Sequence, residues 1–183
     1  AAGSSPEREA LLLAEAPAFA SKRGPLVRLY SAYFKRLPDT AGLAYWLGKY
    51  TGGMKLDDIS AKFAASSEFQ NKYGNTTNAQ FVTLVYNNVM GRDPDAGGLS
   101  FWVTKLNAGM SRGTVMTNFS ESSEGTRKFR PYVDTALVSL GLLGQIAPAK
   151  LVNAVLDYMK LDSPERGLQR LVVSPEYAAA AAG

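Results

Sequence analysis

Four residue types that could grip a ligand recur at a fixed interval along this chain. An arginine, an aspartate, a tryptophan and a glutamate each return 56 positions later. The first copy holds Arg36, Asp39, Trp46 and Glu68, and the second holds Arg92, Asp95, Trp102 and Glu124. An arginine beside a carboxylate and an indole can bind a sugar ring or a carboxylate through hydrogen bonds and stacking. The recurring set is therefore the candidate ligand motif of this sequence.

The arginines and glutamates of the motif also have a structural interpretation, which we favour. Both types recur together, each arginine near the start of its copy and each glutamate near the end. We therefore expect Arg36 to pair with Glu68, and Arg92 with Glu124. Each pair would hold the first helix of a copy to its last helix.

The aspartates and tryptophans of the motif have structural roles of the same kind. Asp39 and Asp95 each follow a proline and precede an apolar stripe, which is typical of a helix N-cap. Trp46 and Trp102 lie on those stripes, so we expect them to anchor the core rather than to form exposed stacking platforms. Ligand binding remains the alternative for the whole motif.

These residues belong to a longer repetition that predicts the architecture. Tyr30–Lys72 aligns with Tyr86–Lys128 without a gap, and a period near this length is typical of helical units that bury their apolar faces against one another. We predict an all-α fold of tandem helical repeats. The predicted segments are an N-terminal helix with possible linker at 1–25, repeats at 26–77 and 78–130, and a degenerate third repeat with tail at 131–183.

Helix signals set the expected boundaries in the first copy. Ser5 followed by proline predicts a leading helix over Pro6–Lys22, which Gly24 and Pro25 should end. A second helix should begin at Leu26 and stop before Pro38, because the residue preceding proline disfavours helical geometry.

The second and third copies follow the same pattern with some losses. Asn78 is the expected N-cap of a helix that runs to Gly91, and the serines at 66 and 122 should each open a short closing helix. The segment Tyr132–Tyr177 lacks the arginine, tryptophan and Pro-Asp pair, so we interpret it as a worn terminal unit. No segment alternates between polar and apolar residues as a half-buried strand does.

The amino-acid composition excludes several kinds of catalytic and metal site. The 183 residues include no cysteine and no histidine, which excludes thiolate nucleophiles, imidazole bases and the usual zinc ligands. The loop after Asp93 lacks the glutamate that an EF-hand calcium site requires. No catalytic residue, cofactor or metal is expected, although a hydrolase that uses two carboxylates stays open as a minor alternative.

Charge and hydropathy bear on the partners. The formal net charge is +4, and the densest basic cluster, at 127–130, is better explained as a solvated helix end than as a nucleic-acid site. No apolar run is long enough to span a membrane. The absence of cysteine favours an exported protein, so we expect an extracellular or cell-surface location.

The motif as a whole resembles a bacterial family called domain of unknown function 4214. The resemblance rests on the strings Tyr30-x5-Arg36-x-Pro38-Asp39-x2-Gly42-Leu43-x2-Trp46, Phe63-x2-Ser66-Ser67-Glu68-Phe69 and Tyr86-x4-Gly91-Arg92-Asp93-Pro94-Asp95-x2-Gly98-Leu99-x2-Trp102. That family is similar in turn to phycobilisome linker domains, which are helical and join proteins together. Here Gly125 replaces the aromatic residue that Phe69 supplies.

The resemblance implies a helical module of exported or surface proteins, among them adhesins and S-layer-like proteins, with no established catalytic residues. We therefore expect a non-catalytic interaction or structural module whose partner is a protein or a neighbouring domain. A carbohydrate-binding module for envelope or extracellular glycans is the alternative. The sequence names neither the partner nor the oligomeric state.

Overall fold

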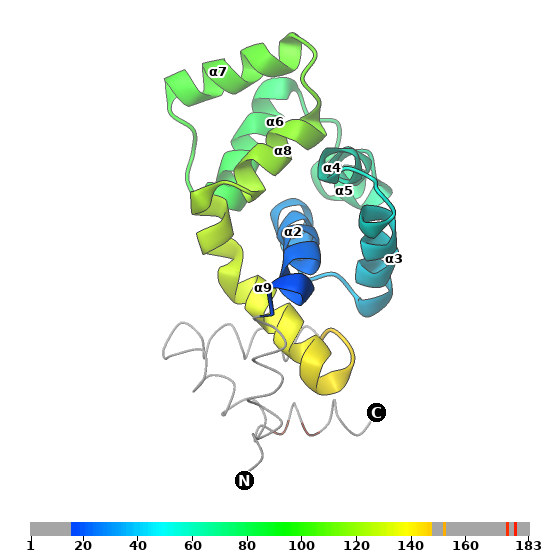
Figure 1. Cartoon of the computed structure of the whole chain (residues 1–183). Coiled ribbons are helices and arrows are strands. Elements are labelled where there is room, and N and C mark those ends of the chain that lie inside the picture. The colour runs from blue at the N-terminus through cyan, green and yellow to red at the C-terminus, as the bar shows by residue number, and fades with distance from the viewer. Residues whose placement is uncertain (1–15, 148–151, 153–174, 176–177, 179–183) are drawn as a thin grey trace.

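The structure is a computed structural model that describes residues 16–147 together with residues 152, 175 and 178. All regular secondary structure within these residues is helical, which confirms the predicted all-α class. Figure 1 shows the other helices arranged around α2. The helices are α2 (Pro17–Phe34), α3 (Thr40–Thr51), α4 (Leu56–Ala64), α5 (Ser67–Tyr73), α6 (Asn78–Val85), the π-helix η1 (Tyr86–Met90), α7 (Ala96–Asn107), α8 (Arg112–Ser120) and α9 (Ser123–Leu143).

Helix α2 is the centre of the bundle. Residues 24–34 are all buried except Arg28, which is half-buried, so this part of α2 has no solvent face. It packs against α3, α4, α5, η1, α8 and α9. A helix that is apolar on all sides belongs in the interior, and the run from Leu26 to Phe34 is apolar apart from Arg28 and Ser31.

The predicted break at Gly24 and Pro25 is wrong, because α2 runs through both residues without interruption. A proline inside a helix costs about 3 kcal/mol through its missing hydrogen bond and its ring clash. Both residues are buried, and a Cβ built on Gly24 would lie 3.6 Å from Val133 of α9. Packing against α9 therefore offsets the local cost. Residues 1–15, which include the start of the predicted leading helix, lie outside the described residues.

The first helix of the second copy differs from α2 in two ways. Its N-cap is Thr77 rather than the predicted Asn78, and Thr77 forms a capping box with Gln80. Its last turn is the π-helix η1, whereas the matching turn of α2 is α-helical. Within η1, the buried Asn88 donates from its side-chain nitrogen to the Ala32 carbonyl of α2, over 2.8 Å. This bond ties the first helices of the two copies together at matching positions.

The closing helix of the second copy is not the short element that the sequence predicts. In the first copy α5 ends at Gly74, which has φ +69°. The matching residue is Arg130, and α9 continues through it and through Pro131 to Leu143. Because no glycine supplies the left-handed turn, the helix crosses the predicted boundary at 130. Most of the predicted third unit, Tyr132–Tyr177, lies outside the described residues.

Two matching helices, α4 and α8, form the closest contact between the copies. Gly113 lies where the helices cross, and a Cβ there would be 2.5 Å from the Asp57 carbonyl oxygen and 2.6 Å from the Ala61 nitrogen. The Ser60 hydroxyl donates to the Gly113 carbonyl over 3.0 Å. Only glycine allows two helix backbones to approach this closely.

Candidate functional site

Both expected ion pairs of the motif are present, but their geometries differ. Arg36 donates to both carboxylate oxygens of Glu68, over 2.8 and 2.9 Å, and this hydrogen bonding raises the pKa of Arg36. Arg92 approaches Glu124 through a single contact of 3.6 Å. Both pairs are well exposed to solvent. Each arginine and glutamate of the motif thus has a partner within its own copy.

The two aspartates of the motif are N-caps, as expected. Asp39 accepts from the Gly42 nitrogen over 2.7 Å, and Asp95 accepts from the Gly98 nitrogen over 2.6 Å. The glycines leave room for a tyrosine of the preceding helix, since a Cβ on Gly42 would lie 2.8 Å from the Tyr30 hydroxyl oxygen. Burial, followed by the charge of Asp39, raises the pKa of Tyr30. These carboxylates therefore stabilise the first turns of α3 and α7.

The two tryptophans lie at the edge of the core, half-buried. Trp46 packs edge-on against Phe63 with ring centroids 5.1 Å apart, and Trp102 packs against Phe119 at the same separation. One side of each indole therefore meets the core, as the apolar stripe predicts. The other side meets an exposed aromatic residue that the sequence reasoning did not single out.

The exposed residue in the first copy is Tyr45, whose side chain is 57% exposed. Its ring stands nearly perpendicular to the Trp46 ring, with centroids 5.0 Å apart. The Lys49 ammonium lies 5.4 Å from the centre of the same ring. We call Tyr45, Trp46 and Lys49 the α3 cluster.

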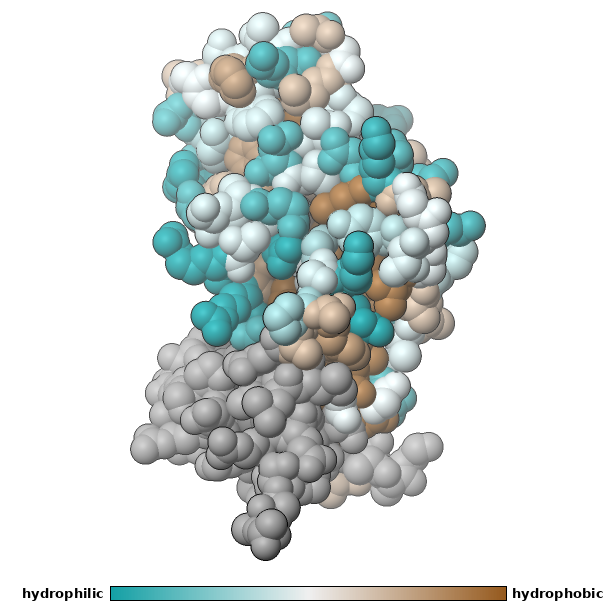
Figure 2. All heavy atoms as spheres, in the orientation of Figure 1, coloured by the Kyte–Doolittle hydropathy of each residue, from teal (hydrophilic) through white to brown (hydrophobic). Residues whose placement is uncertain are grey.

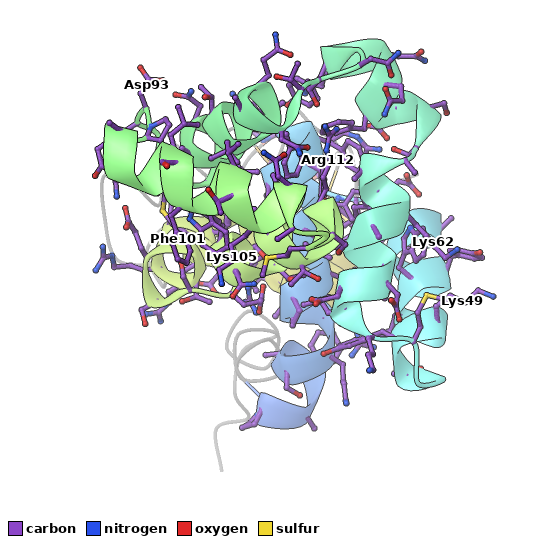
Figure 3. All side chains as sticks on the ribbon, turned by 90° about the horizontal axis from the view of Figure 1, so that it is seen from above. Lys49, Lys62, Asp93, Phe101, Lys105 and Arg112 are labelled. Carbon is purple, nitrogen blue, oxygen red and sulfur yellow. The ribbon has the colours of Figure 1, made fainter. Side chains whose placement is uncertain are left out.

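The second copy repeats this arrangement on α7. Phe101 is 53% exposed, its ring lies 5.1 Å from that of Trp102, and the Lys105 ammonium lies 5.5 Å from its centre. We call Phe101, Trp102 and Lys105 the α7 cluster. Figure 3 shows Phe101 and Lys105 projecting from the same side of α7. Tyr45 and Phe101 are the two large hydrophobic residues that stand exposed among the described residues.

A signal for these clusters is present in the sequence. An aromatic residue directly precedes each tryptophan and a lysine follows three positions after it, 56 residues apart in the two copies. The aromatic residue lies off the apolar stripe, which is where a solvent-facing side chain is found.

One ion pair between the two copies leaves no such signal in the sequence. Arg28 and Glu121 form a two-point ion pair that joins α2 to the turn between α8 and α9. The matching positions of the other copy hold Leu84 and Ala65, so the repetition could not reveal this pair.

The sequence predicts neither a metal site nor a membrane-spanning helix. Among the described residues, no cluster of three or more acidic side chains is placed to bind a metal ion. No helix in this part of the chain combines the length and the hydropathy that a membrane crossing requires.

One part of the chain matches a known protein family. Residues 60–129 match the family described as Domain of unknown function (DUF4214), which confirms the resemblance for this segment. The matching segment begins inside α4 and ends in α9, so it contains the α7 cluster and the complete second copy of the motif. No curated protein and no solved structure matches the chain.

Proposed function

We propose that this chain is a non-catalytic interaction module that binds another protein through the α3 and α7 clusters. One observation carries the proposal: an exposed aromatic ring stands at the same place in both copies, with a tryptophan and a lysine in the same arrangement around it. Aromatic residues are enriched at the centres of protein interfaces, because they bury a large area at a small cost in side-chain entropy.

The charged residues of the motif already bond within the chain, which supports the same conclusion. The aspartates cap helices, and the glutamates pair with arginines of their own copy. A pair of carboxylates that performs acid–base chemistry needs one member available to a substrate. The charged residues of the motif are thus explained by stability, whereas the exposed rings of Tyr45 and Phe101 are not.

A protein partner suits the clusters better than a glycan does. Sugar recognition combines a stacking ring with planar hydrogen-bonding groups such as carboxylates and amides that read the hydroxyls. Neither α3 nor α7 contains an aspartate or a glutamate, and the one amide between them, Asn107, is bonded to Asn78. We also propose an exported or cell-surface location, which the family resemblance and the lack of cysteine support.

The test is a pull-down from the cell-envelope extract of the bacterium that encodes the chain. The bait is compared with the double variant Tyr45→Ala, Phe101→Ala, and Arg127→Ala serves as the exposed control on α9. We expect a bound protein that the double variant loses and the control retains. Loss of the signal after periodate treatment of the extract, but not after protease treatment, would establish the glycan alternative instead. Equal retention by the double variant would overturn the proposal.

A further inference from the structure

We infer that the chain is bivalent: the α3 and α7 clusters are two equivalent docking sites, each for an amphipathic helix that carries carboxylates beside its apolar face. This inference rests on the proposed function and adds the chemistry of the partner and the number of sites.

The equivalence of the sites follows from their geometry. The separation of the aromatic and tryptophan rings differs by 0.1 Å between the copies, and so does the distance from the lysine to the ring. Helices α3 and α7 have the same length, and their cluster residues occupy the same helical positions. Two surfaces on which a ring, an indole and an ammonium have the same spacing select the same class of partner, although Tyr45 has a hydroxyl that Phe101 lacks.

The sites are separate surfaces rather than halves of one. Helix α7 lies at one end of the bundle and α3 along its side in Figure 1, and in the view from above in Figure 3 Lys49 lies at the edge of the molecule, well away from Lys105. In the space-filling view, apolar atoms appear among hydrophilic ones at the end of the molecule where α7 lies (Figure 2). Each site can therefore be occupied independently.

Charge complementarity indicates an acidic partner. Helix α3 contains one charged residue, Lys49, and helix α7 contains one, Lys105. Within the described part of the chain, neither lysine has a carboxylate within ion-pair distance. Their position in the last helical turn also suits the helix dipole, which explains a cation there but not an exposed aromatic ring beside it. A partner carboxylate would complete both arrangements.

The surroundings of the rings favour a helix as the partner element. Besides the lysine of each cluster, the exposed neighbours of Tyr45 are Ala41, Ala44 and Gly48, and those of Phe101 are Gly97, Ser100 and Thr104. Small residues around one large side chain let an incoming helix approach closely and receive the ring between its own ridges. The described part of the chain has no strand, so a partner cannot add to a sheet edge there.

The chain has two tryptophans, one in each cluster, so each site carries its own reporter. Incorporation of fluorotryptophan gives one fluorine NMR signal for each cluster without changing the fold, and Trp46→Phe assigns the two signals. The probe is a synthetic helical peptide that is about two turns longer than α7. Its leucines at positions i, i+3, i+4 and i+7 form an apolar face, and glutamates lie along both edges of that face. The comparison peptide has lysines in place of the glutamates.

We expect the acidic peptide to shift both fluorine signals, with dissociation constants that agree within about threefold, and to bind at least about tenfold more tightly than the basic peptide. Tyr45→Ala should remove the response at Trp46 and leave that at Trp102, whereas Phe101→Ala should do the reverse. Lys49→Glu should weaken only the α3 site, and Arg127→Glu, which removes the same charge elsewhere, should weaken neither.

The inference is overturned by a response at one signal only, by equal binding of the two peptides, or by no binding. In each of these cases the pull-down with the double variant still decides the proposed function, because it uses the native partner whatever its charge or stoichiometry.

Discussion

The first helices of the two copies precede the same motif but lie in different environments. Helix α2 is surrounded by six other helices, and residues 24–34 are almost entirely buried. The matching segment of the second copy, α6 followed by η1, has an exposed face that includes Asn87, and its last turn is a π-helix. In an open array of repeats each unit contacts only its neighbours. Here α2 also packs along α9, with Gly24 opposite Val133, so the copies form a bundle around one central helix.

The largest expected loss of stability is at the crossing of α4 and α8. The second copy has Gly113 there, whereas the matching residue of the first copy is Asp57. Gly113→Ala would place a methyl group within 2.6 Å of two backbone atoms of α4. We expect a loss of about 3 kcal/mol in the free energy of unfolding, because backbone cannot give way as a side chain does. Urea unfolding measures it. Gly48→Ala is the matched control: apart from adjacent residues and the backbone of its own helix, no atom lies within 4 Å of the added methyl, so stability should rise by about 1 kcal/mol.

The central position of α2 also predicts a specific response to alkali. Tyr33 is fully buried and its hydroxyl bonds to that of Ser60 over 2.9 Å, whereas the matching residue of the second copy is Val89. Burial raises the pKa of Tyr33 above its usual value of 10. Above pH 10 the unfolded chain therefore releases a proton that the folded chain retains, and stability falls as the pH rises.

Tyr33→Phe should lower stability by about 1–2 kcal/mol at neutral pH and make its decline above pH 10 less steep. Thermal melts across pH 7–11 would show both effects. An unchanged alkaline slope would mean that Tyr33 ionises as easily in the folded chain as in the unfolded one.

A smaller difference lies at the C-cap of these two helices. Lys35 adopts a left-handed conformation with φ 55°, and its counterpart Gly91 has φ 69°. Because a side chain costs about 1 kcal/mol in this region, Lys35→Gly should stabilise the protein by roughly that amount. The reverse change, Gly91→Lys, should destabilise the protein by about the same amount, because the atom nearest to the new Cβ is the ammonium at the flexible end of Lys128, which can move aside. A fall in melting temperature for Lys35→Gly would contradict the cost assigned to the left-handed lysine.

The smallest effects are expected at the exposed ion pairs. Arg36→Met should lower stability by less than about 1 kcal/mol, because solvent screens a pair of this exposure. Arg92→Met should lower the melting temperature by less still, since its single 3.6 Å contact is weaker than the two-point pair of Arg36. Melting temperatures of the two variants in low and high salt would show which ion pair contributes more to stability. An unchanged melt for both variants would remove the structural role proposed for the motif arginines.

The sequence by itself determined the local features of this protein. The all-α class, the capping aspartates and the arginine–glutamate pairs all follow from residue types at short or repeated spacings. Caps depend on a side chain and a backbone amide three residues apart, and the ion pairs recur with the motif. Such features need no knowledge of the remaining chain.

Only the tertiary structure decided which elements continue and which faces stay exposed. Helix α2 passes through Gly24 and Pro25, and α9 passes through Arg130, because packing between distant segments outweighs local signals. Tyr45 and Phe101 face solvent because no other described helix covers α3 and α7 there. Burial is a property of the assembled bundle, and the candidate docking sites could therefore be recognised only after α2 was seen to occupy its centre.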